Sequence, residues 1–239
     1  MADPIGLLLS VRGEARVVVA PDSVVLSCAL TVSRTSKAEA MAGAAAASRR
    51  LTADLASLGG VSLGVDTEQA ALTWSARSAT SWEESQHNKL TGLDEPSERV
   101  NATVELQVTT RTFDILDALG AHLGTHKELH VRQVNWRVNS DNPAWAQVRA
   151  AAIHAAIATG RDYATALGVS LLEVAHVADA GLLDGEMSLT GGNRPRGAMM
   201  SAGGGSSLAD TPSLDPEPQE LTATIDARLR ATAVTLTGS

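Results

Sequence analysis

Three histidines, His122, His126 and His130, follow one another at intervals of four residues. On an unbroken helix this spacing would place three imidazoles on one face, where zinc or nickel could bind. Gly124 interrupts the helix, however, and His130 is expected at the start of the next strand. No carboxylate or cysteine joins the spacing as a fourth ligand. We therefore expect solvent-exposed loop histidines and no metal or other cofactor, and keep the three residues as the candidate metal ligands.

Cys28 is the only cysteine, so the chain forms no intramolecular disulfide. It lies on the apolar register of a predicted strand, away from any helix N-terminus that would lower the pKa of its thiol. The expected role is that of a small buried hydrophobic residue. The sequence contains no phosphate-binding loop, dinucleotide fingerprint or G-x-S-x-G nucleophile motif. We predict no catalytic residues and a protein that is not an enzyme.

Residues 75–98 are polar and show no clear period, which is typical of a long mobile loop or a lid. Within this stretch Trp82 stands beside Glu83 and Glu84. An aromatic side chain among acids in a long connection is a common recognition feature, so these residues are candidates for an interaction site. The alternative is that Trp82 packs back on the body of the protein.

Residues 181–219 are rich in Gly, Ser, Met and Pro. Such a segment buries too little apolar surface to offset its ordering entropy, so we interpret it as a flexible insertion before a last strand. Arg194 and Arg196, with methionines nearby, could dock a protein partner and order on binding. An unselective linker is the alternative, and the sequence does not decide between the two.

The overall charge argues against nucleic acid as the main partner. Acidic residues outnumber basic ones, for a formal net charge of −8 and a pI near 5.2, and no Lys/Arg cluster occurs. No stretch reaches the ~20 apolar residues that span a bilayer. The amino terminus carries an acid and a proline where a secretion signal has basic residues. We expect a cytoplasmic protein.

Hydrophobic periodicity indicates seven strands and three helices. The turn at Pro21-Asp22 predicts that the first two strands are antiparallel neighbours. Ser36 and Glu39 form a capping box at the first helix. The expected strands cover 11–19, 24–32, 65–74, 100–108, 129–138, 171–180 and 221–229, and the expected helices cover 36–58, 112–123 and 142–168.

The helix over 142–168 is the longest predicted element. Asn142 is a good N-cap, Pro143 suits the first turn and Gly168 can take the left-handed conformation that ends a helix. A seam of small residues repeats every fourth position, which would let the helix lie unusually close to a sheet. The seam consists of Ala152, Ala156, Gly160 and Ala164, and the buried face is expected to include Trp145, Val148, Tyr163 and Leu167.

This order of elements predicts an α+β fold: a largely antiparallel sheet covered on one face by helices, with repeated β-α-β units and one long alanine-rich helix. The β-α-β unit is expected once around 36–58 and again around 112–123. The chain is expected to form one domain over 1–239, interrupted by the loop at 75–98 and the insertion at 181–219.

The stretch 11–22, VRGEARVVVAPD, resembles the opening signature of the SIMPL-domain family. The alanine-rich helix that ends at Leu167-Gly168 and the Leu58-Gly59-Gly60-Val61 segment are also similar to that family, and the resemblance covers roughly 11–180 and 221–236. It implies an α+β domain without an established catalytic centre. Bacterial members are mostly exported, form large homo-oligomers and are linked to oxidative or other stress. An animal member associates with a kinase of innate immune signalling.

Two hypotheses of function follow. The first is a non-enzymatic, self-assembling homo-oligomer that serves stress tolerance or acts as a scaffold, with a protein partner docking through 181–219. The second is a small-molecule-binding or hydrolytic protein with its site under the loop at 75–98. The second predicts a deep pocket with convergent polar groups and perturbed titratable residues. A flat, apolar outer sheet face would favour assembly.

Overall fold

The computed structural model describes residues 6–64, 70–88, 93–182 and 214–233, and its α+β fold confirms the predicted class. The chain divides into two compact units. The terminal unit contains residues 6–19, 140–182 and 218–233 of the described chain, and the central unit contains residues 20–139 and 214–217. Because the first and last strands pair with each other, the chain leaves the terminal unit after residue 19 and returns to it later.

The central unit contains a mixed sheet with strand order β3-β4-β6-β2-β7. β2 and β4 are both antiparallel to β6, and β6 and β7 are both antiparallel to β2. Two β-α-β units therefore interleave, as in the ferredoxin-like split β-α-β motif, and confirm the predicted repeat. The elements are β2 (Ser23–Arg34), α1 (Lys37–Ser57), β3 (Gly60–Ser62), β4 (Leu72–Ala76), β5 (Thr80–Asn88), β6 (Leu93–Thr110), η1 (Phe113–Ile115), α2 (Leu116–Thr125) and β7 (Leu129–Arg137).

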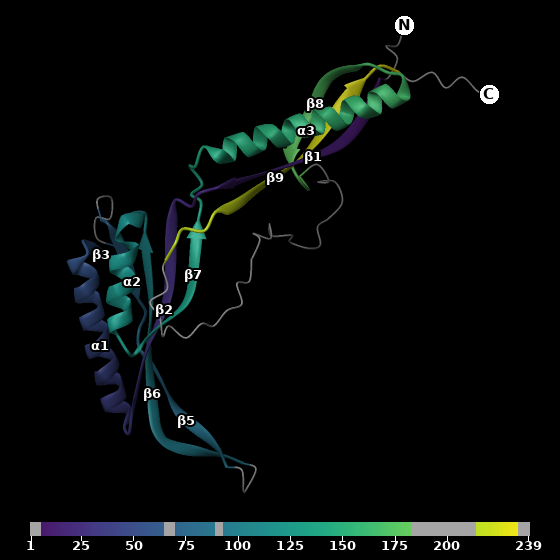
Figure 1. Ribbon diagram of the computed structural model, residues 1–239. Helices are drawn as coiled ribbons and strands as arrows, with labels where there is room; N and C mark the ends of the chain where they lie inside the picture. The colour runs from purple at the N-terminus through teal and green to yellow at the C-terminus, as the bar shows by residue number, and fades with distance from the viewer. Residues whose placement is uncertain (1–5, 65–69, 89–92, 183–213, 234–239) are drawn as a thin grey trace. The chain divides into compact units, whose positions relative to one another are not determined.

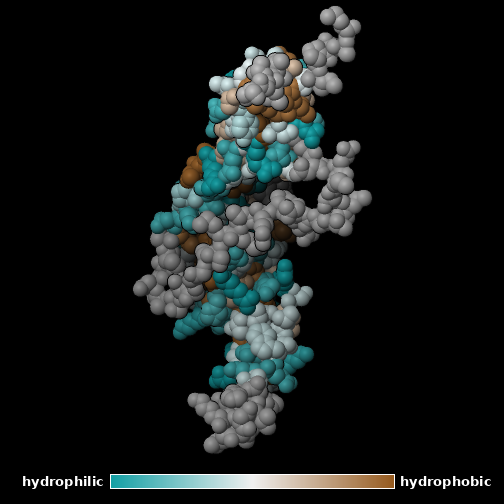
Figure 2. All heavy atoms as spheres, turned by 90° about the vertical axis from the view of Figure 1, so that its right-hand side faces the viewer, coloured by the Kyte–Doolittle hydropathy of each residue, from teal (hydrophilic) through white to brown (hydrophobic). Residues whose placement is uncertain are grey.

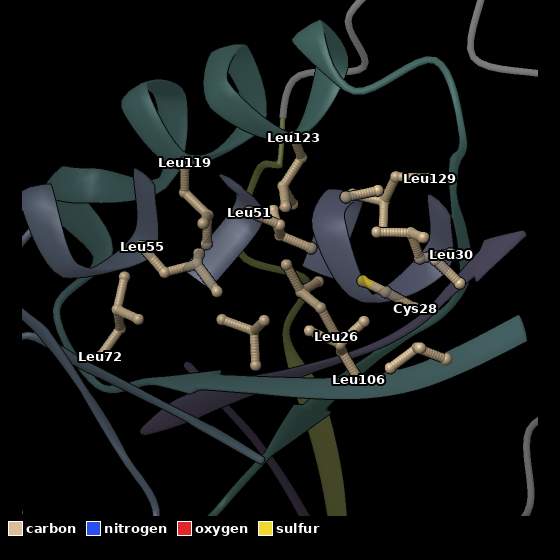
Figure 3. Packing of buried hydrophobic residues seen from close by; sticks show 14 of the residues in the cluster. Leu26, Cys28, Leu30, Leu51, Leu55, Leu72, Leu106, Leu119, Leu123 and Leu129 are labelled. Atoms are coloured by element: carbon tan, nitrogen blue, oxygen red, sulfur yellow. The ribbon is translucent and has the colours of Figure 1, made fainter. Parts of the chain in front are cut away.

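The core of the central unit lies between its sheet and the two helices. α1 and α2 cover one face of the sheet (Figure 1). Alternate residues of β2 and β6 face these helices and meet leucines at helical spacing (Figure 3). Leu26, Leu30, Leu51, Leu55 and Leu119 are almost completely buried. Ser36 caps α1 by accepting a hydrogen bond from the backbone N–H of Glu39, as predicted.

The polar stretch at 75–98 does not form the predicted loop. β5 and the first part of β6 pair as an antiparallel hairpin, in register from Thr80↔Thr103 to Asn88↔Leu93, with an irregularity between Glu83 and Ser85. Trp82, Glu83 and Glu84 are all exposed, so this part of β5 has no buried apolar face. The period-two signal that identifies a half-buried strand is absent for that reason.

The predicted hairpin of the first two strands is also wrong. β1 (Leu7–Val19) pairs with β9 (Gln219–Ala231), whereas β2 pairs with β6 and β7 in the other sheet. The Pro21-Asp22 turn therefore leads the chain from one unit to the other instead of closing a hairpin.

The terminal unit is a three-stranded antiparallel sheet with strand order β1-β9-β8, and one helix packs on it. β1 and β9 match residue by residue over thirteen pairs, from Leu7↔Ala231 to Val19↔Gln219, without a bulge. β8 (Leu171–Asp179) completes the sheet, and its register with β9 shifts twice. Residues 183–213, most of the predicted insertion, lie outside the described chain, and β9 confirms the strand predicted after it.

The long helix, α3 (Ala144–Leu167), confirms most of its predicted features. Asn142 Oδ1 accepts the backbone N–H of Ala144 at 2.9 Å, and Gly168 ends the helix with a positive φ of 67°. Every fourth residue is buried, namely Ala144, Val148, Ala152, Ala156, Gly160 and Ala164. Tyr163 and Leu167 are exposed, contrary to expectation, because the contact with the sheet is a narrow stripe along the small residues.

Two glycines explain why α3 lies so close to the sheet. A Cβ atom on Gly13 would collide with the backbone of Ala152 and Ala156, so β1 and the helix are in backbone contact. A Cβ atom on Gly160 would collide with the side chain of Leu229 on β9. The helix therefore lies across both β1 and β9.

The outer face of the terminal sheet carries a partly buried ion pair. Arg12 binds Asp226 with two hydrogen bonds, 2.7 Å from Nε to Oδ1 and 3.1 Å from Nη2 to Oδ2. The backbone N–H of Gly181 donates to Asp226 Oδ2 at 3.0 Å. The hydrogen bonds from Arg12 have the largest effect on Asp226, and together with the Gly181 N–H they hold its pKa below the ordinary value of 3.8. The Asp226 side chain is only 12% exposed, whereas that of Arg12 is 60% exposed, so solvent reaches the guanidinium side of the pair.

Substitution of the close-packing glycines is expected to destabilise the terminal unit. Gly13→Ala and Gly160→Leu should each lower the free energy of unfolding, by about 1–3 kcal/mol, because helix and sheet must separate. Gly124→Ala is the matched control, since a Cβ atom there meets nothing within 4 Å, and alanine in a helix should be neutral or stabilising by up to about 1 kcal/mol. Urea denaturation measures all three. Equal stability of the Gly13 variant and wild type would show that the helix does not touch β1.

Loss of the Arg12 guanidinium is expected to remove a pH-dependent part of the stability. A carboxylate with a lowered pKa in the folded state stabilises the protein above its unfolded pKa, and this contribution disappears as the pH falls. Arg12→Gln should therefore reduce stability at pH 7, and the difference from wild type should shrink below about pH 4. Arg16→Gln serves as control because Arg16 pairs with the exposed Glu14. A constant difference across thermal denaturation from pH 7 to pH 3 would contradict the assignment.

Candidate functional site

A shallow hollow lies on the outer face of the central sheet, opposite the helices. Its volume is about 250 Å³, and it is lined by Ser27, Cys28, Ser75, Arg77, Glu105, Leu106, Gln107 and Arg132. Because Ser27 and Ser75 both pair with Gln107 in register, two hydroxyls and an amide occupy one row across β2, β4 and β6. Polar side chains from neighbouring strands therefore converge on a single place.

Two arginines hold one carboxylate in this hollow. Arg132 Nη1 lies 3.2 Å from Glu105 Oε1, and Arg77 Nη1 lies 3.4 Å from Glu105 Oε2. The backbone also supports the arrangement, since the N–H of Arg77 donates to the carbonyl of Glu105 at 2.8 Å. The three charges sum to +1 in a protein of net charge −8. Each guanidinium keeps further N–H donors for an anionic ligand.

A register shift explains how Arg132 reaches the hollow. The pairing of β2 with β7 shifts between Ser27, opposite Gln133, and Cys28, opposite Val131. Arg132 is the extra residue of the bulge, and a bulge can turn a side chain to the other face of a sheet. Sequence periodicity does not reveal this placement, because the shift depends on the partner strand.

Cys28 faces the helices and belongs to the core (Figure 3). Burial raises the pKa of its thiol to about 12, so almost no thiolate forms near neutral pH. This confirms the predicted buried position.

The structure separates the three histidines. His122 is on α2, His126 ends that helix and His130 is an exposed residue of β7. Within the described residues, no group of three or more His, Cys, Asp or Glu side chains is placed to hold a metal ion. His126 has a different partner: its Nε2 lies 2.8 Å from Asp54 Oδ2 on α1, and its side chain is only 8% exposed. The sequence did not indicate this link between the helices.

The acidic and aromatic candidates lie on the projecting hairpin. Trp82 is 47% exposed and stands opposite Asn101, and Glu83 and Glu84 are exposed. None of the three lines the hollow. Arg194 and Arg196 lie outside the described residues.

Exposed large apolar side chains concentrate on the terminal unit. Figure 2 shows hydrophobic atoms gathered over this unit near the C-terminal end of α3. Among the described residues, eight of the eleven exposed large hydrophobic side chains belong to it. They are Leu8, Val18, Tyr163, Leu167, Leu172, Val174, Val177 and Leu182, whereas the central unit contributes Leu63, Trp82 and Val134.

The open face of the central sheet has the opposite character. Ser27, Ser75, Glu105 and Gln107 lie there, and none of these four side chains is apolar. Among the described residues, the surroundings of the hollow are therefore polar, unlike the flat apolar face that would favour assembly.

Comparisons with known proteins bear on this arrangement. No described helix is long and apolar enough to cross a membrane. The comparison with curated proteins gives no match. The model of one protein family, described as "SIMPL: Protein of unknown function (DUF541)", matches residues 9–229 and so spans both units. Since this match extends over far more than half of the 239 residues, the chain belongs to the SIMPL family.

Proposed function

We propose that the protein is a non-enzymatic scaffold that assembles with copies of itself through the terminal unit. The observation that carries this proposal is the concentration of exposed apolar side chains on that unit. Exposed apolar side chains that concentrate on one part of a protein can mark an interaction surface. Burying a half-exposed Leu or Val contributes on the order of 1 kcal/mol, so several residues together can support association.

The two units would then have different tasks. The terminal unit supplies the apolar surface for assembly, while the polar face of the central sheet stays in contact with solvent. A cytoplasmic location belongs to the proposal, since the single buried cysteine calls for no oxidising compartment. We also propose a role in stress tolerance, which the family resemblance supports. We propose further that a protein partner binds through 181–219, because the composition of this segment is typical of regions that order on binding.

The oligomeric state of the full chain tests the proposal. Light scattering at micromolar concentration should give a mass that is a multiple of 24.7 kDa. Leu8→Ser combined with Leu172→Ser should lower this mass, whereas Leu63→Ser with Val134→Ser, the matched pair on the central unit, should not. A stable wild-type monomer would overturn the proposal, and an equal effect of both pairs would remove the terminal unit from it.

A second candidate function is the binding of a small organic anion in the hollow of the central sheet. The specific observation is the Arg77–Glu105–Arg132 group above a floor of hydroxyl and amide side chains. A volume of about 250 Å³ suits a small metabolite and lies below that of sites for drug-sized ligands. An anionic group would bind the free guanidinium donors, and the rest of the ligand would bind the floor.

Inorganic phosphate is the probe for this candidate. Calorimetric titration should detect weak binding that Arg132→Gln and Arg77→Gln both reduce at least tenfold. Arg50→Gln is the matched control, since Arg50 is similarly exposed and pairs with Glu128 at 3.8 Å away from the hollow. Acetate in a parallel titration distinguishes a carboxylate from a phosphate site. Equal binding by all three variants would exclude the hollow.

A further inference from the structure

The open face of the central sheet continues beyond the hollow along β6. Residues directly opposite each other on neighbouring strands share one face of a sheet, and so do residues two apart on one strand. Glu105 lines the hollow, so Thr103 and Asn101 are the next two β6 residues on the same face. The four residues of extended strand from 105 to 101 span about 13 Å. This face therefore suits a ligand longer than the hollow itself.

The row at Thr103 carries hydroxyl groups. Thr103 is opposite Thr31 on β2 and opposite Thr80 on β5. The hydroxyl oxygens of Thr31 and Thr103 are 2.7 Å apart, and since Thr103 is only 4% exposed, this hydrogen bond orients the more accessible hydroxyl of Thr31. Thr80 is exposed. Because a hydroxyl both donates and accepts, Thr31 and Thr80 can bind the hydroxyls of a ligand in either sense.

The next row brings an aromatic ring to this polar face. Trp82 on β5 is opposite Asn101 on β6, and the two strands run side by side (Figure 1). The Trp82 side chain is 47% exposed. A half-exposed indole presents a flat apolar surface with an N–H at its edge. The C–H side of a sugar ring packs on such a surface, while an amide such as that of Asn101 binds the hydroxyls at the rim of the ring.

We propose that this face binds a short oligosaccharide with one acidic sugar at its end. The carboxylate of that sugar binds Arg77 and Arg132 in the hollow, and a neutral sugar ring stacks on Trp82. The sugar between them hydrogen-bonds to Thr31 and Thr80. A trisaccharide has the length that separates the two ends. This inference rests on the proposed anion binding in the hollow and names the class of ligand.

The charges along the face select this class. Arg77, Arg132 and Glu105 sum to +1, which one carboxylate neutralises. A phosphate ester carries about −1.5 to −2 near neutral pH, and a nucleotide with further phosphates exceeds the charge of the hollow more strongly. No described residue in the rows at Thr103 and Asn101 is charged. Glu84, the unmatched residue in the irregularity of β5, is exposed close to Trp82 and disfavours a second anionic group at that end.

Calorimetric titration of the full chain tests the ligand class with two probes, sialyllactose and aldotriouronic acid. Each joins one acidic sugar to two neutral sugars. At least one probe should bind about tenfold more tightly than its isolated acidic sugar, N-acetylneuraminic acid or glucuronic acid, because the neutral sugars add contacts with Trp82 and the threonines. The neutral parts alone, lactose and xylobiose, should bind more weakly than the complete probes, because they lack the carboxylate.

Substitutions test the two ends of the site. Trp82→Ala should reduce the affinity for the trisaccharide to that for the isolated acidic sugar, whereas Trp82→Phe should retain part of the difference because a ring remains. Arg132→Gln should weaken the binding of both the trisaccharide and the acidic sugar. Tyr163→Ala is the matched control, since Tyr163 is an aromatic residue that is 52% exposed and belongs to the terminal unit. Thermal denaturation establishes that each variant is folded.

The outcomes separate this inference from anion binding itself. Suppose that acetate or phosphate binds and that Arg132→Gln weakens this binding. If neither trisaccharide then exceeds its acidic sugar, or if Trp82→Ala has no effect, the oligosaccharide assignment is overturned and the hollow remains an anion site. Neutral sugars that bind as tightly as the complete probes, or an equal loss in Tyr163→Ala, would also overturn it. If no anion binds, both proposals fail.

Discussion

The backbone contact between α3 and β1 is the constraint on which the terminal unit depends. Gly13 has no Cβ, so the helix at Ala152 and Ala156 lies directly on the strand. Gly160 permits the same approach above Leu229. A helix this close covers β1 and β9 through a narrow stripe of small residues, which leaves Tyr163 and Leu167 at its sides and most of β8 uncovered. The exposure of Tyr163 and Leu167 on α3 is thus a consequence of close packing.

The central unit is built on a different principle. Its helices meet the sheet through leucines, and the core between them is thick and apolar. With the core confined to one face, the other face is free to carry polar groups. The bulge in β7 adds Arg132 to that face, where it and Arg77 hold Glu105. The polar hollow and most of the exposed apolar side chains therefore lie on separate units, so the two proposed functions, ligand binding and self-association, can be tested independently.

The sequence by itself determined the elements whose signals are local. The capped helices, the small-residue seam of α3, the inward position of Cys28 and the repeated β-α-β order all follow from periodicity and turn residues. The sequence also resembles the SIMPL family, and the family match confirms this resemblance. Tertiary structure alone decided which strands pair. β1 joins β9 some two hundred residues away, β5 forms a strand although Trp82, Glu83 and Glu84 are exposed, and Arg132 and His126 reach partners that are remote in the chain. The physical reason is that a strand's pattern shows which face is buried, whereas its neighbours depend on long-range hydrogen bonds that leave no trace in local spacing.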